Sequence, residues 1–338
     1  MTDYFRPLVQ IGPARPDTAV SLAGGWGWFT HAEVLSRHAP PRVVPAADIP
    51  ASVMARLTVP RPAMAGLTLD RPRIMGILNT TPDSFSDGGQ HNAVPDALRV
   101  AQKMVAAGAD ILDIGGESTR PGADFVHVSE EITRTAPVIA ALRGAGLHTP
   151  ISIDTRKAAV AEAAVSAGAN LVNDVSGFTF DPALGPLCQK LALPVCVMHA
   201  QGDPATMHLD PQYDNVLLDV FDALERQISM LEVSGIPRGA ILADPGIGFG
   251  KTQDHNLALL ARLSLFHALG TPILLGVSRK RFIGTIGNAP QAQDRAPGSI
   301  AVALAGLGQG VQMIRVHDVD DTRQAVALWH AAYFGSIL

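Results

Sequence analysis

The chain has 338 residues, of which 47% are hydrophobic and 17% charged, so it holds enough apolar side chains for a large core and is not intrinsically disordered. A net charge of −5, without any run of lysine or arginine, excludes the basic surface that a polynucleotide needs, and we expect no nucleic-acid partner. No stretch approaches the roughly 18 consecutive apolar residues of a membrane helix, and the N-terminus lacks the pattern of a signal peptide, so we expect no membrane association and a cytoplasmic location.

The cysteine content also indicates a cytoplasmic location. Cys188 and Cys196 are the two cysteines of the chain, too few for a disulfide framework or for a four-cysteine zinc site. We interpret them as buried apolar thiols in a reducing compartment.

Residues 1–65 differ in composition from the remainder of the chain. Ten of the 25 prolines lie in the first 72 residues. Because proline lacks an N–H and breaks helices, we expect no long helix there, whereas the aromatic and β-branched pieces predict short strands. The segment is therefore predicted to be a small, proline-rich, irregular and partly β N-terminal extension, in which Trp26 and Trp28 serve packing.

From Arg73 onward one pattern repeats, in which a short apolar run and a polar cluster precede a segment of helical periodicity. The apolar runs cover residues 73–79, 110–116, 150–155, 170–177, 194–199, 240–246, 272–278 and 312–318. Continuous apolar strands that alternate with amphipathic helices require a parallel sheet covered by helices. Eight such units predict an α/β fold, a (β/α)₈ TIM barrel over residues 66–338, and an open doubly wound sheet is the alternative. GLTLD at 66–70 is expected to close the lower end of the barrel as a short strand or hairpin.

The first helical segment illustrates the helical signal. Its apolar residues recur at helical spacing, and Gly108 follows at the position that ends a helix. These residues are Ala97, Leu98, Ala101, Met104 and Val105. The runs AAGADIL, SAGANLV and GQGVQM repeat the same glycine junction between a helix and the next strand.

Polar residues gather at the ends of the predicted strands. They are Asn79, Glu117, Asp154, Asn173, His199, Asp244, Lys280, Arg315 and His317. In barrels of this kind the carboxyl ends of the strands and the following loops build the active site. A single such residue is explained by a cap or a turn, but the whole set predicts an active site.

Their chemistry separates into two sets. Asp154, Asn173, Asp244 and Lys280 offer acceptors and donors to a flat polar heterocycle such as a pterin or a purine, because a carboxylate accepts two N–H bonds from an amidine-like edge. The second set, Asn79, Arg315 and His317, comes from the first and last strands, which are adjacent in a closed barrel. It offers an oxygen ligand and two potential cations, which suits a diphosphate bound with Mg²⁺.

Several familiar motifs are absent. GIGFGKT at 246–252 resembles a phosphate loop, but Pro245 stands where that loop needs its first glycine. The glycines at 246, 248 and 250 do not form a dinucleotide fingerprint either, and Phe249 is better placed to cover a ligand. The histidines are spread without zinc-ligand spacing, and no Gly-x-Ser-x-Gly elbow of a hydrolase occurs.

A series of longer motifs resembles one known family. NTTPDSFSDGG (79–89), ESTRPGA (117–123), SIDT (152–155), NDVSG (173–177), DPGIGFGKT (244–252), GVSRK (276–280) and IRVHD (314–318) stand in this order. Together they resemble dihydropteroate synthase, and the resemblance covers about residues 66 to 335.

The resemblance implies an enzyme of folate biosynthesis that condenses para-aminobenzoate with hydroxymethyl-dihydropterin diphosphate, giving dihydropteroate and diphosphate. It implies Asp154, Asn173, Asp244 and Lys280 as pterin ligands and Asn79 as the ligand of a Mg²⁺ cofactor. It implies Asp83, Thr119, Arg120, Arg315 and His317 at the diphosphate, and Phe249 and Lys280 at para-aminobenzoate. Lys280, Arg315, His317, Asp87 and Arg120 are the expected catalytic residues, and a homodimer is the expected assembly.

One position departs from the family pattern. The family commonly has a serine directly after the active-site lysine, with its hydroxyl near the aminobenzoate carboxylate, whereas this chain has Arg281. Our hypothesis is that Arg281 serves that carboxylate through its backbone N–H or its guanidinium. The alternative is a side chain directed to solvent.

Two other functions remain open at this point. A methyltetrahydrofolate:corrinoid methyltransferase has the same kind of pterin contacts but no use for a diphosphate site, so Asn79, Arg120, Arg315 and His317 favour the synthase. The other alternative, an inactive pterin-binding paralogue, usually loses loop residues, and both loop motifs are complete here.

Overall fold

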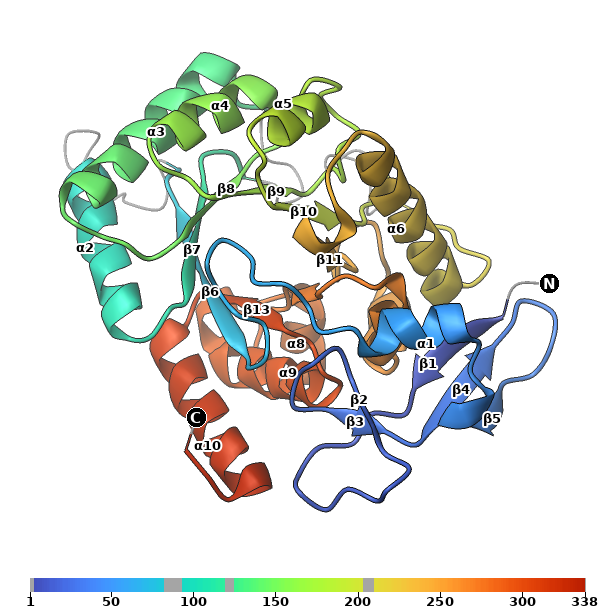
Figure 1. The fold of residues 1–338 in the computed structure, drawn as a ribbon. Coiled ribbons are helices and arrows are strands. Elements are labelled where there is room, and N and C mark those ends of the chain that lie inside the picture. The colour runs from blue at the N-terminus through green and yellow to red at the C-terminus, as the bar shows by residue number, and fades with distance from the viewer. Residues whose placement is uncertain (1–2, 82–92, 119–124, 203–209, 338) are drawn as a thin grey trace.

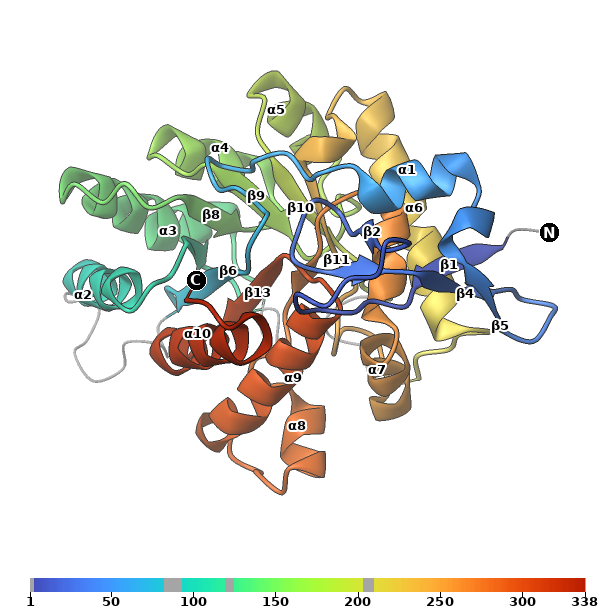
Figure 2. The ribbon, with the colours of Figure 1, turned by 60° about the horizontal axis from the view of Figure 1, so that its bottom comes forward.

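The structure, a computed structural model, describes residues 3–81, 93–118, 125–202 and 210–337. Eight parallel strands form one sheet in the order β11-β10-β9-β8-β7-β6-β13-β12, surrounded by helices (Figures 1 and 2). The last strand pairs with the first, Ile314 opposite Ile74, and a bridge between Ala243 and Ile273 joins β11 to β12. The sheet therefore closes on itself. The predicted barrel is confirmed, and the open doubly wound alternative is wrong.

All eight predicted strands are present. They are β6 (Arg73–Asn79), β7 (Ile111–Gly115), β8 (Ile151–Asp154), β9 (Leu171–Asp174), β10 (Val195–Met198), β11 (Ile241–Asp244), β12 (Leu274–Leu275) and β13 (Met313–Val316). The α-helices outside them are α2 (Ala93–Ala106), α3 (Val128–Gly144), α4 (Ala158–Ser166), α5 (Leu184–Lys190), α6 (Val216–Val233), α7 (Gln253–Leu260), α8 (Arg281–Ile286), α9 (Ala296–Gly308) and α10 (Val319–Phe334). The 3₁₀ segments are η4 (Arg238–Ala240), η5 (Leu263–Leu269) and η6 (Ala292–Arg295).

The predicted glycine junctions operate as helix ends. Gly108 follows α2 with φ +98°, and the N–H of Ala109 bonds to the carbonyl of Met104. Gly168 follows α4 with φ +117°, and the N–H of Ala169 bonds to the carbonyl of Ala164. A left-handed residue at this position is compatible with glycine and costly for other residues, so the glycine turns the chain from each helix into the next strand.

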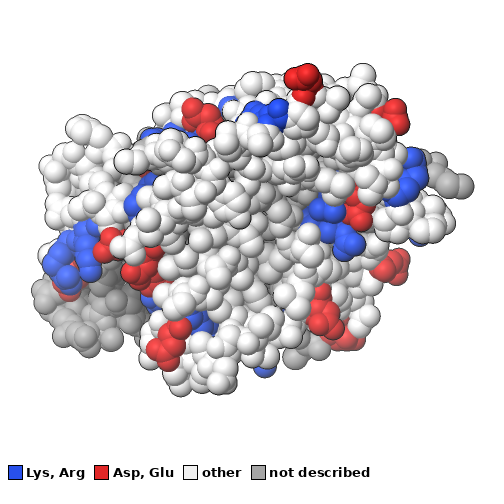
Figure 3. Space-filling view, turned by 90° about the horizontal axis from the view of Figure 1, so that it is seen from below, with Lys and Arg blue, Asp and Glu red and all other residues white. Residues whose placement is uncertain are grey.

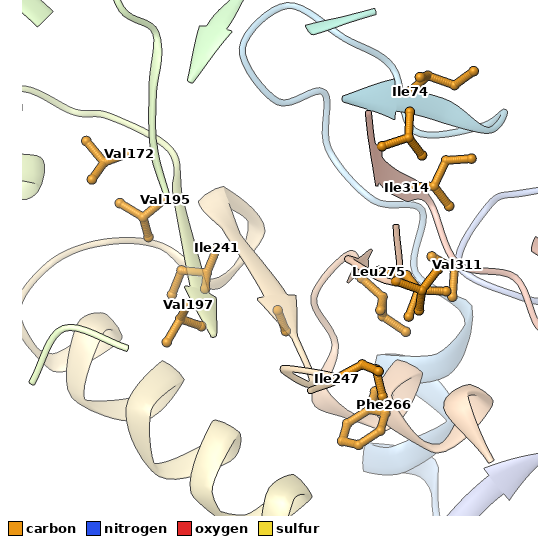
Figure 4. Packing of buried hydrophobic residues seen from close by; sticks show 14 of the residues in the cluster. Ile74, Val172, Val195, Val197, Ile241, Ile247, Phe266, Leu275, Val311 and Ile314 are labelled. Carbon is orange, nitrogen blue, oxygen red and sulfur yellow. The ribbon is translucent and has the colours of Figure 1, made fainter. Parts of the chain in front are cut away.

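Alternation along each strand decides which side chains face the barrel interior. One set, which includes Val172, Val197 and Ile314, packs in the cluster between the strands and the helices (Figure 4). The other set points inward and builds a buried apolar layer at the amino ends of the strands. This layer comprises Met75, Ile111, Leu171, Cys196, Leu242, Leu274 and Met313. Side chains two residues further along a strand point to the same face, so the next inward layer lies nearer the carboxyl ends.

A hairpin closes the lower end of the barrel, as predicted. The backbones of Met64 and Leu67 bond to each other in both directions, and Met64 and Leu69 are buried against the inward apolar layer. The division of the chain after residue 65 stays a prediction, but it falls inside this tight turn.

The N-terminal extension contains short strands, in line with its composition. Its elements are β1 (Tyr4–Pro7), β2 (Val20–Ser21), β3 (Trp28–Phe29), β4 (His31–Leu35), β5 (Arg42–Pro45), η1 (Ala46–Asp48) and α1 (Ala51–Thr58). β1, β4 and β5 form an antiparallel sheet, and β2 pairs with β3. Trp26 and Trp28 are buried, and the indole N–H of Trp26 donates to the carbonyl of Leu307 at 2.9 Å. The tryptophans therefore act in packing, and the extension is tied to the outer helices.

Two further expectations concern the buried cysteines and the membrane. Cys188 and Cys196 are free and buried, as predicted. None of the helices within the described ranges combines the length and the apolar composition that crossing a bilayer requires.

Candidate active site at the carboxyl ends of the strands

Strand alternation brings the predicted pterin set into the barrel interior. Asp154, Asn173 and Asp244 each lie two residues beyond an inward-pointing position of their strand, and all three are largely buried. Arg315 lies two residues beyond Met313 on β13. The four side chains therefore share the layer above the apolar one.

The guanidinium of Arg315 lies between two carboxylates. Its Nε lies 2.6 Å from Oδ2 of Asp113, and its Nη2 lies 2.8 Å from Oδ2 of Asp154. The Asn173 amide also donates to Asp113 Oδ2, at 3.1 Å. Arg315 thus pairs with Asp113 and with one predicted pterin ligand, Asp154, and its expected contact with the diphosphate stays a prediction.

Asp113 is a site residue that the sequence reasoning missed. It lies inside β7 rather than at its end, is fully buried, and its Oδ1 has no hydrogen-bond partner among the described residues. Ser152, its register neighbour on β8, also has a buried hydroxyl without such a partner. A carboxylate in an otherwise apolar strand, two residues before the strand's end, was the signal that could have revealed Asp113.

Burial controls the ionisation of the carboxylates. It raises the pKa of Asp154 to about 7, against the opposing effect of the Arg315 charge. Burial also raises the pKa of Asp244, whereas the backbone N–H of Gly246 donates to Asp244 Oδ1 at 2.7 Å and lowers it. Buried acceptors of this kind bind a ligand's N–H groups strongly, because water does not compete for them.

The predicted aminobenzoate residues meet in the loops after β11 and β12. The Lys280 ammonium lies 4.0 Å from the centroid of the Phe249 ring, in a cation–π contact. A Cβ atom at Gly248 would come within 3.1 Å of Lys280 Cδ, so the loop backbone lies directly against the lysine stem. Arg281 is exposed at the first position of α8, and the structure brings Phe249 and Lys280 together.

The predicted diphosphate residues occupy the neighbouring strands. Asn79 is half-buried at the end of β6, next to β13 in the closed sheet. His317 directly follows β13, where its Nδ1 lies 2.9 Å from the Ser278 hydroxyl and its backbone N–H donates to the same oxygen. Asp83, Asp87, Thr119 and Arg120 lie outside the described residues.

Glu117 and His199, which also belong to the polar set predicted at the strand ends, make contacts within the protein that stabilise neighbouring loops. Glu117 forms ion pairs of 3.1 Å with Arg156 and with Lys157, and it accepts the backbone N–H of Val126. His199 is buried beside Lys251, and burial lowers its pKa to about 3, so its ring is neutral. Both therefore stabilise the walls of the site.

The residues present are compatible with Mg²⁺ bound together with a substrate phosphate. No group of three or more His, Cys, Asp or Glu side chains within the described part of the chain is arranged to hold a metal by itself. Mg²⁺ commonly keeps several waters and takes one or two protein oxygens plus substrate phosphates. The Asn79 amide oxygen is a suitable ligand for that mode of binding.

Similarity to known proteins identifies the class of enzyme to which this barrel, with buried carboxylates and amides at its strand ends, belongs. The model of the pterin-binding enzyme family matches residues 75–317. Dihydropteroate synthase of Synechocystis is 44% identical over 257 residues, which cover 75% of this chain and 89% of that protein.

Two solved structures show the same fold. Dihydropteroate synthase of Xanthomonas albilineans with 4-aminobenzoic acid has a TM-score of 0.75 and 45% identity, and the match covers 79% of this chain and 96% of that one. The same organism's enzyme in complex with 7,8-dihydropteroate has a TM-score of 0.72 and 42% identity, over 79% and 95% of the two chains. The chain belongs to the dihydropteroate synthase family of pterin-binding enzymes.

Proposed function

We propose that this protein condenses para-aminobenzoate with hydroxymethyl-dihydropterin diphosphate to form dihydropteroate and diphosphate. The observation that carries the proposal is the buried layer of Asp113, Asp154, Asn173 and Asp244 around Arg315, in a chain of this family. These acceptors suit the amidine-like N–H edge of a pterin. Oδ1 of Asp113, which has no hydrogen-bond partner among the described residues, adds an acceptor that a bound ring would satisfy.

Pterin binding is the role of the carboxylates and Asn173. Asp244 presents a carboxylate held at one oxygen by the Gly246 N–H, which leaves its other oxygen for the ligand. Asp154 and Asn173 come from the neighbouring strands β8 and β9, so one flat ring reaches all three. Lys280 adds a donor at the same edge of the barrel.

Departure of the diphosphate is the step in which charge develops. The bond between the pterin methylene carbon and the diphosphate oxygen breaks, and the electron-rich pterin stabilises the positive carbon. Arg315 and His317 stabilise the negative charge on the leaving group. The family resemblance adds Arg120 as a further cation, assigns Asp83 and Thr119 to diphosphate binding, and assigns a catalytic role to Asp87. Mg²⁺, when bound through Asn79 and the diphosphate, supplies additional positive charge there.

The arylamine then forms the new bond. Its nitrogen lone pair attacks the methylene carbon, and the nitrogen loses one proton to solvent. Because an arylamine is unprotonated at neutral pH, the site needs no strong base, and positioning by Phe249 and Lys280 dominates. The absence of a nucleophile motif in the sequence agrees with this mechanism.

The test of the function is direct turnover. Purified protein is mixed with the pterin diphosphate, para-aminobenzoate and Mg²⁺, and dihydropteroate is followed by chromatography, with metal-free and enzyme-free controls. Metal-dependent product is expected. Binding of the pterin diphosphate without turnover would instead favour the inactive paralogue. Folded protein that shows no binding and no turnover would refute the proposal.

Arg281 is proposed to serve the carboxylate of para-aminobenzoate. It follows Lys280 at the start of α8, and its exposed guanidinium is long enough to turn towards a bound anion. The contact is made either by the backbone N–H of Arg281 or by its guanidinium, and KM for para-aminobenzoate in Arg281→Ser and Arg281→Ala distinguishes the two. An unchanged KM in both variants removes the guanidinium from the mechanism.

We also propose a homodimer and a cytoplasmic location. The side of the molecule that lies at the bottom of Figure 1 is largely uncharged at its centre (Figure 3). Helix α10 exposes the apolar side chains of Leu328 and Tyr333. Such a surface favours association with a second copy, which light scattering after gel filtration measures. The free Cys188 and Cys196 are compatible with a reducing compartment.

A further inference from the structure

Lys251 is a buried lysine to which the proposed mechanism gives no role. Only 5% of the residue is exposed, and no carboxylate among the described residues forms an ion pair with it. Its ammonium instead lies among four neutral acceptors. These are His199 Nδ1 at 2.9 Å, the Gly246 carbonyl at 2.9 Å, the Phe249 carbonyl at 3.0 Å and the His199 carbonyl at 3.3 Å. These acceptors satisfy the N–H donors of the buried ammonium without a carboxylate partner from the described part of the chain.

The acceptors belong to two elements that Lys251 joins. His199 directly follows β10, whereas Gly246 and Phe249 belong to the loop after β11, which we call the 245–251 loop. The two elements are in close contact, because a Cβ atom at Gly246 would lie 1.9 Å from the His199 carbonyl oxygen. Gly246, with φ +67°, therefore has no acceptable substitute, and the carbonyls of Gly246 and His199 both accept from Lys251.

The 245–251 loop forms a wall of the proposed aminobenzoate pocket. Phe249 contacts the Lys280 ammonium through its ring, and its carbonyl accepts from Lys251. Gly248 lies against the Lys280 stem, and its N–H donates to the Asn256 side chain at 2.7 Å. The position of this wall thus depends on the hydrogen bonds of Lys251 on one side and of Asn256 on the other.

Lys251 also determines the tautomer of its neighbour. When Lys251 is charged it only donates, so Nδ1 of His199 accepts and the neutral ring carries its proton on Nε2. Burial lowers the pKa of His199 to about 3, which keeps the ring neutral. Burial lowers the pKa of Lys251 to about 7; the Asp244 charge opposes this shift, and the Lys280 charge adds to it.

We propose that Lys251 is a positioning residue that fixes the 245–251 loop, so that Phe249 and Gly248 hold Lys280 in place for para-aminobenzoate. This inference rests on the proposed function. It predicts a larger defect for para-aminobenzoate than for the pterin, because two of the four proposed pterin ligands, Asp154 and Asn173, come from strands that do not belong to the loop, whereas Asp244 and Lys280 contact it. A general loss of stability would lower the amount of active enzyme without changing KM.

The test uses Lys251→Met, which keeps the length of the side chain and removes every donor, with the exposed Lys190→Met as the matched control. The first measurement needs no turnover. Hydrogen exchange of a peptide that covers the 245–251 loop is expected to accelerate about tenfold in Lys251→Met, with no change in the control or in a β13 peptide. The second measurement is KM for para-aminobenzoate, expected to rise about tenfold, whereas the Kd for the pterin diphosphate changes less than about threefold.

A second pair of variants keeps the inference testable if Lys251→Met does not fold. His199→Asn retains an acceptor near the position of Nδ1, whereas His199→Leu removes it. KM for para-aminobenzoate should rise in His199→Leu and remain near the wild-type value in His199→Asn.

The outcomes separate the two proposals. Unchanged loop exchange and unchanged KM in Lys251→Met, or an equal loss for both substrates, overturns the role of Lys251. If wild-type protein does not form dihydropteroate, the proposed function fails, and loop exchange still decides whether Lys251 fixes the loop.

Discussion

Replacing Arg315 with methionine tests the electrostatics of the site most directly. The wild-type guanidinium neutralises two carboxylates, at 2.6 Å from Asp113 and 2.8 Å from Asp154. The side chain of Asp113 is 0% exposed and that of Asp154 is 12% exposed, so water does not replace the lost partner. Breaking a buried ion pair from one side costs about 3–5 kcal/mol, and two carboxylates facing each other place Arg315→Met at the upper end of that range.

The loss of stability in Arg315→Met should increase as the pH rises. Without the guanidinium, burial and the neighbouring Asp113 charge raise the pKa of Asp154 further above its unfolded value. A carboxyl whose pKa is raised in the folded state takes up a proton on folding, so its contribution to stability is lost as the pH rises through that pKa. The deficit of Arg315→Met is therefore expected to be small at pH 5 and full at pH 8.

Scanning calorimetry at both pH values measures this. At about 2 °C per kcal/mol for a chain of this size, Tm at pH 8 should fall by roughly 6–10 °C. The control is Arg99→Met, whose exposed pair with Asp96 at 3.2 Å should leave Tm within about 2 °C of wild type. An equal Tm for Arg315→Met and wild type at pH 8, or the same deficit at both pH values, would refute the reasoning.

Three further predictions concern the metal, the pterin and acid stability. Asn79→Ala should raise the Mg²⁺ concentration needed for half-maximal activity about tenfold; an unchanged Mg²⁺ dependence would contradict its assignment as the ligand. Asp244→Ala should weaken pterin binding at least about tenfold in calorimetry with the fold intact, because it removes a buried carboxylate acceptor; unaltered affinity would exclude this contact. Burial lowers the pKa of His267 to about 3, and protonation would leave Nδ1–H without an acceptor beside Arg61. The unfolded chain thus takes up the proton first, and His267 alone should lower the free energy of unfolding by about 1.4 kcal/mol per pH unit between roughly pH 6 and pH 3, in addition to a contribution of the same sign from His199. His267→Gln should show a shallower slope in denaturant titrations, and an identical slope would exclude His267 as its source.

The periodic features of the sequence were sufficient to predict the barrel. The eight apolar runs and the glycines after the helices are local signals, since a strand or a helix end depends mainly on neighbouring residues. The rule that barrel sites lie at the carboxyl ends then selected Asp154, Asn173 and Asp244 before any contact was known.

Contacts between distant residues were decided only by the tertiary structure. Arg315 and Asp113 are separated by 202 positions in the chain, and only barrel closure brings β13 close enough to β7 for their side chains to pair. Lys251 follows a glycine-rich loop, and no local pattern indicates that its ammonium is enclosed by the end of β10. The docking of Trp26 on Leu307 is equally non-local.

The physical reason is the difference between periodicity and burial. Periodicity is a property of residues close together in the sequence, and it determines on which face of a strand a side chain lies. Which ion-pair and hydrogen-bond partners a buried charged group has depends on the other helices and strands that pack against it in the folded chain. The sequence by itself therefore determined the barrel and the location of its site, and the tertiary structure decided the ionic partners of Asp113, Asp154 and Arg315 within it.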